Sequence, residues 1–193
     1  MNVHYKVILL GDVTVGKSSI SQQLVRKTFR DKSDSTIGAA YALLKHDDLL
    51  IDLWDTAGQE RYNSIIPVYY RDADIVILVF DVNNVETFKK VNYYINKITT
   101  EEKKRPVFIV VGNKTDLITR QSRLKVEERI NKEIDTALVN TFFVSAKTGE
   151  NILTLEETIC NICYLINKVA PYSIKLIDEP ENKKPTYLPN CQC

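Results

Sequence analysis

The sequence predicts an α/β fold in which a mostly parallel β-sheet is covered by helices on both faces. Short apolar runs alternate along the chain with segments whose apolar residues recur every three or four positions, as strands alternate with amphipathic helices. Most of these runs are apolar throughout, which is typical of strands buried on both faces. The 193 residues, 44% hydrophobic and 26% charged, have the composition of a single globular domain.

Six segments have the features of strands, because they are short, rich in Val, Ile, Leu and Phe, and bounded by polar residues or glycine. The second and third are separated only by the polar residues 46–48 and form the one expected hairpin, which adds an antiparallel edge strand to the sheet. The six expected strands are Tyr5–Leu10, Tyr41–Lys45, Leu49–Trp54, Ile75–Phe80, Val107–Val111 and Thr141–Val144.

Helical periodicity occurs in four places between or after these strands. Beyond about Ala170 it stops, and prolines with scattered charges predict a flexible tail over 171–193 that follows a folded domain over 1–170. The apolar positions that define the helices are Ile20 and Leu24; Phe88, Val91, Ile95 and Ile98; Val126, Ile130, Ile134 and Leu138; and Ile152, Leu155, Ile159, Ile162, Cys163 and Ile166.

Charge and hydropathy exclude some function classes. The formal net charge is +1, so no basic field is available to collect nucleic acid, and we expect no nucleic-acid binding. Apolar runs such as Ile75–Phe80 are far shorter than the roughly 20 residues of a membrane span. The N-terminus lacks the pattern of a signal peptide, so we expect a cytosolic protein.

Four cysteines, Cys160, Cys163, Cys191 and Cys193, lie in the last fifth of the chain, which is not how a disulfide framework is distributed. A zinc site made from the two pairs is one possibility. Cys160 and Cys163 fall on the apolar face of a helical pattern, however, so we favour ordinary core cysteines.

The strongest functional signal is Gly11–Ser18, which matches G-x-x-x-x-G-K-[ST] between the first strand and a helical pattern. In this motif the glycines let the loop fold around phosphates, and backbone N–H groups bind them. Lys17 is expected to reach the β- and γ-phosphates, and Ser18 to bind Mg²⁺. The candidate phosphate-binding residues are Asp12, Val13, Thr14, Val15, Gly16, Lys17, Ser18 and Ser19.

Two later segments predict recognition of guanine. Asn113-Lys114-Thr115-Asp116 follows a strand, so Asp116 is expected at its carboxyl end, where α/β sheets bind ligands. A carboxylate there accepts hydrogen bonds from guanine N1–H and the exocyclic amine, whereas adenine would leave it unpaired. Ser145-Ala146-Lys147 ends the following strand and offers a backbone N–H to guanine O6.

The segment Asp55–Glu60 follows the strand that ends at Trp54 and supplies the remaining chemistry of GTP hydrolysis. Asp55 is expected to hold Mg²⁺ through water, and Gly58 to bring its N–H to the γ-phosphate. Gln59 is the candidate catalytic residue, because it can orient the attacking water.

Over roughly residues 5–170 the chain resembles the small GTPases of the Ras superfamily. The resemblance is closer to the Rab proteins, and Ala39-Ala40 is similar to their endosomal branch. The resemblance implies the P-loop NTPase (small G-protein) fold with a six-stranded sheet. It also implies that Thr36 binds Mg²⁺ and the γ-phosphate from switch I, and that Phe29 packs against guanine. The motifs that carry it, besides those above, are 37–41, 61–65, 69–71 and 191–193.

The resemblance also assigns an effector surface, since Tyr41, Trp54 and Tyr69 correspond to the aromatic triad of Rab proteins. Three positions depart from the family pattern. Val13 stands where relatives usually carry Gly or Ser, Lys32 replaces an aromatic residue over the phosphates, and Asp72 replaces a glycine. The hairpin between Tyr41 and Trp54 is shorter than usual.

Cys191-Gln192-Cys193 lacks C-a-a-X spacing and resembles a doubly geranylgeranylated Rab terminus. Two lipid chains give stable anchoring where one is marginal. An unmodified terminus is the alternative. The charges of the tail cancel, so no polybasic patch would assist membrane binding.

The preferred interpretation is a monomeric GTP-dependent switch of membrane trafficking. It is expected to cycle between cytosol and the cytoplasmic face of intracellular membranes, with endosomes as the candidate compartment. The resemblance implies an exchange factor, a GTPase-activating protein (GAP), a GDP-dissociation inhibitor or escort protein, and GTP-dependent effectors. A hydrolysis-defective, mostly GTP-bound scaffold is the alternative that Val13 suggests. A small ATP-dependent phosphotransferase is disfavoured by Asp116.

Overall fold

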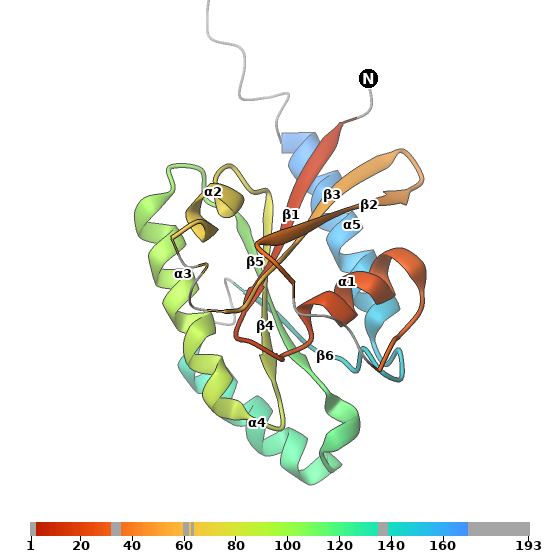
Figure 1. Ribbon diagram of the computed structural model, residues 1–193, viewed down its shortest axis with the longest axis vertical. Coiled ribbons are helices and arrows are strands. Elements are labelled where there is room, and N and C mark those ends of the chain that lie inside the picture. Colours follow the sequence, from red (N-terminus) through yellow and green to blue (C-terminus); the bar gives the residue numbers. More distant parts are fainter. Residues whose placement is uncertain (1–2, 32–35, 60–61, 63, 135–138, 170–193) are drawn as a thin grey trace, which may run out of the picture.

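The computed structural model describes residues 3–31, 36–59, 62, 64–134 and 139–169. Its centre is a six-stranded sheet in the order β2-β3-β1-β4-β5-β6, with helices on both faces (Figure 1). Only β2 is antiparallel to its neighbour, so the predicted mostly parallel α/β fold is confirmed. The strands are β1 (His4–Gly11), β2 (Ala39–His46), β3 (Leu49–Thr56), β4 (Ile75–Asp81), β5 (Val107–Asn113) and β6 (Asn140–Phe143).

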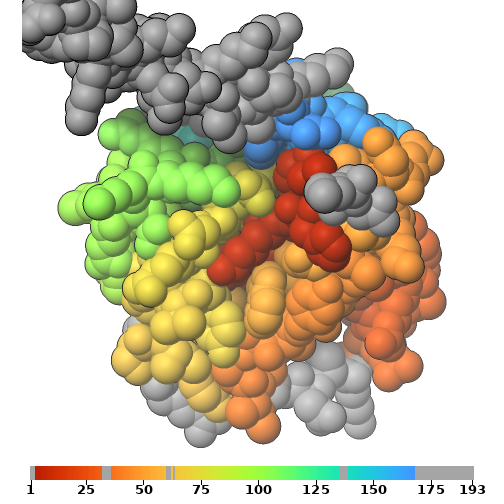
Figure 2. Space-filling model, turned by 90° about the horizontal axis from the view of Figure 1, so that it is seen from above, coloured from red at the N-terminus to blue at the C-terminus, as the bar shows by residue number. Residues whose placement is uncertain are grey.

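The expected hairpin joins β2 to β3 at the edge of the sheet. Ala39 pairs with Thr56 and His46 with Leu49, so His46 belongs to the strand and the turn has only two residues. Asp47 in this turn has a φ of 48°, a conformation that Asp tolerates better than most residues. Figure 2 shows the start of β1, in red, between this hairpin in orange and the yellow chain around α2 and β4.

Helices α1 and α5 cover one face of the sheet, and α2, α3 and α4 cover the other (Figure 1). Single turns of 3-10 helix, η2 (Val85–Phe88) and η3 (Thr115–Leu117), precede α3 and α4. Among the described residues no helix is long and apolar enough to cross a membrane. The helices are α1 (Lys17–Arg26), α2 (Ile66–Tyr70), α3 (Lys89–Glu101), α4 (Arg120–Glu133) and α5 (Ile152–Val169).

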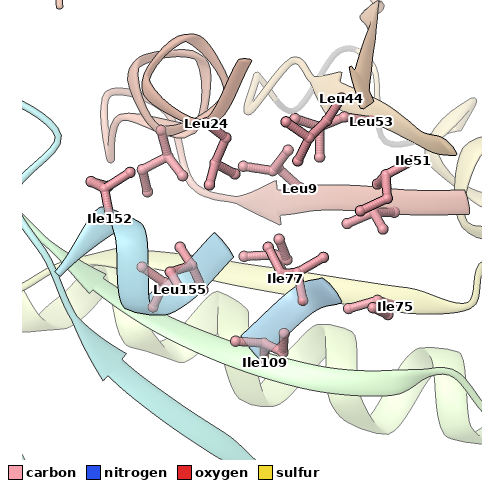
Figure 3. Packing of buried hydrophobic residues seen from close by; sticks show 14 of the residues in the cluster. Leu9, Leu24, Leu44, Ile51, Leu53, Ile75, Ile77, Ile109, Ile152 and Leu155 are labelled. Atoms are coloured by element: carbon pink, nitrogen blue, oxygen red, sulfur yellow. The ribbon is translucent and has the colours of Figure 1, made fainter. Parts of the chain in front are cut away.

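The two cores follow from the alternation of side chains along buried strands. On β1, Val7 and Leu9 pack into the core beneath α1 and α5, whereas Ile8 and Leu10 pack toward α3. Figure 3 shows the first of these cores, in which Leu24 and Leu155 lie near Leu9. Each such fully buried aliphatic side chain contributes roughly 1.5–3 kcal/mol, so the sheet is a rigid support for the loops at its ends.

Two helices differ from the expectations. The periodicity predicts that the third of the expected helices continues through Ile134 to Leu138, but α4 ends at Glu133 and Ile134 has an extended backbone. Ile134 still packs into the second core, so its apolar character marks burial and not helix. Leu138 lies outside the described residues. The five-residue helix α2 was not predicted, because it is too short to show periodicity.

Candidate nucleotide-binding site

A cavity of about 670 Å³ lies where the loops after β1, β3, β5 and β6 meet. These are the carboxyl ends of parallel strands, where open α/β sheets bind their ligands. The volume is within the usual range for small-molecule sites. Residues from all of the predicted motifs line it: Val13, Thr14, Gly16, Lys17, Ser18, Ser19, Phe29, Asp31, Thr36, Thr56, Gly58, Gln59, Asn113, Lys114, Asp116, Leu117, Ala146 and Lys147.

The two glycines of the phosphate loop are required by close packing. A Cβ on Gly11 would lie 2.2 Å from the carbonyl oxygen of Val79, and one on Gly16 would lie 2.2 Å from Nδ2 of Asn113. Gly16 also has a φ of 94° and precedes the first turn of α1. The loop therefore turns sharply into α1, with the helix N-terminus directed at the cavity, which is the geometry of an anion site.

Two backbone carbonyl groups of the phosphate loop hold the side chain of Lys17. Its Nζ donates to the carbonyl oxygen of Asp12 at 2.7 Å and to that of Gly11 at 3.2 Å. Burial lowers the pKa of Lys17 to about 8, although the nearby carboxylates of Asp55 and Asp12 oppose the shift. A desolvated ammonium group fixed at the start of a helix is suited to bind phosphate.

Three oxygen-bearing side chains meet beside Lys17. Ser18 Oγ lies 3.0 Å from Thr36 Oγ1, which donates to Asp55 Oδ2 at 3.3 Å. Burial raises the pKa of Asp55, while its hydrogen bonds and Lys17 act in the opposite direction. Its Oδ1 is buried with no hydrogen-bond partner among the described residues. An oxygen-only group with one unsatisfied carboxylate oxygen fits Mg²⁺, bound directly or through water.

The segment after β3 packs directly on the phosphate loop. A Cβ on Gly58 would lie 2.5 Å from the carbonyl oxygen of Asp12 and 2.6 Å from Lys17 Nζ, so only glycine fits there. The neighbouring Ala57 N–H donates to the Gly38 carbonyl at 2.8 Å. This bond ties the chain around Gly58 to the chain around Thr36. Gln59 and Val13 both line the cavity at this end.

Asn113 organises the opposite end of the cavity. Its Nδ2 donates to the carbonyl oxygen of Val15 at 2.8 Å, and its Oδ1 accepts from the Ala146 N–H at 3.0 Å. It is buried at the end of β5 and so joins the phosphate loop to the loop after β6. Asn113 was predicted as a nucleotide-binding residue, and the geometry indicates that its side chain acts mainly as a brace between loops.

Asp116 lies on the cavity wall with its Oδ1 accepting from Ser145 Oγ at 2.6 Å. Ser145 Oγ in turn accepts from the Thr148 N–H at 3.1 Å. Lys114 forms an ion pair of 2.6 Å with Asp81. The carboxylate of Asp116 therefore has a fixed direction at the point where the sequence predicts recognition of the base.

Four predicted residues do not line the cavity, namely Asp12, Val15, Asp55 and Ser145. Asp12 Oδ1 accepts from the Val13 N–H at 2.8 Å and pairs with Lys90, while Val15 and Ser145 are buried. The structure adds lining residues that the sequence analysis missed. Thr56 and Leu117 each adjoin a motif residue, so the motifs were a signal for them, whereas nothing in the pattern singled out the third, Asp31.

The predicted aromatic triad is contiguous on the surface. The ring of Trp54 lies 5.4 Å from that of Tyr41 and 5.9 Å from that of Tyr69. Tyr41 Oη donates to Asp52 Oδ1 at 2.7 Å, which fixes the more exposed ring. These residues come from β2, β3 and α2, so their arrangement depends on the same segments that carry Thr36 and Gly58.

Two departures from the family pattern can be checked. Asp72 has a φ of 58°, the left-handed conformation in which a glycine costs nothing and Asp is better tolerated than most residues. Val13 has about 40% of its surface exposed, on the cavity wall. Lys32 lies outside the described residues.

Cys160 and Cys163 are buried in the core beneath α5, and the described residues contain no group of three or more His, Cys, Asp or Glu side chains that could hold a metal ion. Burial raises the pKa of Cys160 to about 11 and that of Cys163 to about 12. Both thiols stay protonated at neutral pH, which does not suit zinc ligands. Cys191 and Cys193 lie outside the described residues.

A lysine-bearing phosphate loop between the first strand and first helix of such a sheet defines a P-loop nucleotide-binding protein. Sequence comparison shows which family of P-loop proteins the chain belongs to. The profile described as "Ras family" matches residues 6–165. The chain therefore belongs to the Ras family of small GTPases, and it is a GTPase.

Three relatives illustrate the match. The Ras-related protein Rab-5B of Plasmodium falciparum is 40% identical over 82% of this chain and 77% of its own. The GTP-binding protein ypt5 of Schizosaccharomyces pombe is 36% identical over 88% and 82%. The Ras-related protein RABF2a of Arabidopsis thaliana is 35% identical over 98% and 90%. The resemblance to the endosomal Rab branch predicted from the sequence is thus confirmed.

Proposed function

We propose that this GTPase is a membrane-associated switch of endosomal vesicle trafficking that alternates between GDP-bound and GTP-bound forms. The observation that carries the proposal is the position of Thr36 Oγ1, 3.0 Å from Ser18 Oγ and 3.3 Å from Asp55 Oδ2. Thr36 thereby joins a surface segment to the phosphate loop and to the end of β3. A ligand with a γ-phosphate would favour this arrangement, and its loss would release it.

The proposed hydrolysis uses groups that the cavity already brings together. Lys17 and the N-terminus of α1 bind the phosphates, and the Gly58 N–H contacts the γ-phosphate. Gln59 orients the attacking water. Mg²⁺, held by Ser18, Thr36 and Asp55, would neutralise developing phosphate charge. Hydrolysis then removes the group that Thr36 and Gly58 bind.

The proposed nucleotide signal reaches the surface through short connections. Thr36 and Gly38 lie two residues apart, and the Gly38 carbonyl accepts the Ala57 N–H. The Tyr69 hydroxyl would lie 3.5 Å from a Cβ on Gly38. A change at Thr36 therefore acts directly on the aromatic triad of Tyr41, Trp54 and Tyr69, which we propose as the surface that GTP-dependent effectors bind.

The remaining features of the proposal come from the family. We expect a monomer that meets an exchange factor, a GAP, and a GDP-dissociation inhibitor or escort protein, and that does not bind nucleic acid. Its membrane association is expected to use prenyl groups on Cys191 and Cys193. This would place it on the cytoplasmic face of endosomal membranes, in exchange with cytosol. The similarity to the Rab-5B protein of Plasmodium falciparum supports this location.

One observation bears on the alternative of a hydrolysis-defective scaffold. The β-branched side chain of Val13 lines the cavity at the end that also holds Gln59 and Gly58. Because the family hydrolyses GTP, we propose that Val13 slows the switch and does not abolish it.

Trp54 is the single tryptophan of the chain, so its fluorescence reports on the triad directly. The emission of Trp54 should differ between the protein loaded with GDP and with a non-hydrolysable GTP analogue. Thr36→Ala should abolish this difference, and Thr36→Ser, which keeps the hydroxyl, should retain it. Identical wild-type spectra with both nucleotides, or an unchanged difference in Thr36→Ala, would contradict the proposed switch.

A further inference from the structure

Glu150 lies outside the nucleotide cavity, in the turn before α5, yet it bonds to three segments around the base-recognition end. Its Oε2 accepts from Thr115 Oγ1 at 2.5 Å and its Oε1 accepts from Arg123 Nη1 at 2.8 Å. Its backbone carbonyl accepts from the Ser145 N–H at 3.2 Å. One residue thus connects η3, α4 and the loop after β6.

Two of these bonds hold the residues that adjoin Asp116. Thr115 precedes Asp116 in the chain, and Ser145 donates its hydroxyl to the Asp116 carboxylate. Glu150 holds the first through its side chain and the second through its backbone. A displacement of either neighbour would move the carboxylate, since Asp116 itself is exposed on the cavity wall.

Arg123 fixes the glutamate in turn. Its guanidinium donates through Nε to Glu127 Oε1 at 2.9 Å and through Nη1 to Glu150 Oε1. It also lies 5.4 Å from the centre of the Phe143 ring, at the end of β6. The arginine is therefore anchored on α4 and on the sheet, and it offers Glu150 a fixed partner.

We propose that Glu150 is a positioning residue for guanine recognition, which holds Asp116 in the direction that bonds both the N1–H and the exocyclic amine of guanine. This inference rests on the proposed role of Asp116. An ordinary surface ion pair contributes little, and the Arg123 contact alone would be of that kind. The hydroxyl of Thr115 differs, because Thr115 is buried and Glu150 is the acceptor of that hydroxyl.

The test compares GDP with IDP, which lacks the exocyclic amine, by measuring the dissociation constant of each. The wild type should bind GDP more tightly by roughly tenfold or more, because IDP forfeits one charge-assisted hydrogen bond. Glu150→Ala should weaken GDP binding about tenfold but IDP binding much less. The dissociation constant for IDP divided by that for GDP should therefore fall at least threefold. Thr115→Val, which removes the donor, should lower the ratio in the same way.

Two further variants separate positioning from general stability. Glu150→Gln keeps an acceptor for Thr115 and should retain a ratio within about twofold of the wild type. Glu133→Ala is the matched control, because the ion pair of Glu133 with Arg129, at 2.9 Å, lies within α4 and involves neither base loop. It should change neither constant.

The outcomes are distinct. A lowered ratio in Glu150→Ala and Thr115→Val, with rescue by Gln, supports the proposal. A loss of thermal stability with an unchanged ratio shows a merely structural role and overturns it. A wild type that does not distinguish GDP from IDP overturns it too, but by refuting the role of Asp116 first.

Discussion

Ser145 and Asp116, 29 residues apart in the chain, are joined by a hydrogen bond of 2.6 Å from the serine hydroxyl to the carboxylate. The bond connects the loops that follow β5 and β6, and it sets the direction of the acidic group on the cavity wall. Asn113 makes the second connection between these loops, through the Ala146 N–H. We therefore expect recognition of the base at two adjacent strand ends, to which the phosphate loop is tied through Val15.

The lowered pKa of Lys17 predicts a proton linkage. Because burial brings the pKa of Lys17 to about 8, roughly half of the side chains are neutral at pH 8. A bound phosphate favours the ammonium form, so GDP binding near pH 8 should take up protons through Lys17, and this uptake should fall as the pH is lowered toward neutrality. Calorimetry in buffers of different ionisation enthalpy measures this uptake. Proton release at pH 8, or no pH dependence, would contradict the assignment.

The carboxyl group of Asp55 predicts a second pH dependence, in the binding of Mg²⁺. Burial raises its pKa, so it protonates at a higher pH than an exposed aspartate. Mg²⁺ requires the carboxylate form, and the slowing of GDP release by Mg²⁺ should therefore weaken on acidification sooner than for an exposed carboxylate. In Asp55→Asn the release rate with Mg²⁺ should approach the rate in EDTA, an acceleration on the order of tenfold or more.

Asp52→Asn is the matched control for this experiment. Asp52 lies three residues earlier in β3, and its carboxylate bonds Tyr41 and His4 away from the cavity. Its variant should keep the full effect of Mg²⁺ on GDP release. An Asp55→Asn protein with an undiminished Mg²⁺ effect would refute the proposed metal site.

Val13 predicts slow hydrolysis. Val13 lines the same cavity as Gln59, and its β-branched side chain has little rotamer freedom with which to move aside. A misplacement of about 1 Å in a water-orienting group costs on the order of 10²-fold. Single-turnover GTP hydrolysis should accordingly be faster by 10- to 100-fold, as an order-of-magnitude estimate, in Val13→Gly or Val13→Ser. The response to a GAP should also increase, because its arginine enters the same space. Equal or slower rates would show that the loop accommodates the valine.

The sequence predicts much of this molecule because its signals are local. Buried strands such as Ile75–Phe80 and the loop Gly11–Ser18 can be recognised from neighbouring residues alone. Ile134 shows where periodicity misleads. It continues the spacing of apolar residues that predicts a helix and it is buried in the core, but the helix ends one residue earlier. The bracing bonds of Asn113 and Glu150 could not be predicted, because each joins segments that are distant in the chain.

The tail gives a prediction that is independent of the folded domain. Replacing both Cys191 and Cys193 by Ser should release the protein from membranes, because two lipid chains are needed for stable anchoring. GDP affinity should be unchanged. Cys160→Ser and Cys163→Ser serve as controls for thiol loss in the core, and these should keep membrane association while losing stability. A double tail variant that still fractionates with membranes would contradict the lipid anchor.

The central claim is selectivity for guanine through Asp116. Asp116→Asn should shift the preference toward xanthine nucleotides, because the xanthine carbonyl accepts from the amide where guanine donates an amine. The variant replaces one acceptor oxygen of the side chain by an NH₂ donor, so the phosphate-binding and metal-binding groups remain as controls. Restored binding to a xanthine nucleotide distinguishes a changed preference from a damaged site.

The most direct measurement is the pair of dissociation constants for GDP and ADP, determined with Mg²⁺ on the wild-type protein. A site that bonds two donors of its substrate base should reject a base lacking them by roughly 10³-fold or more. We therefore predict GDP binding at least that much tighter than ADP binding. Comparable constants for the two nucleotides would contradict the assignment of Asp116 and with it the proposed GTP switch.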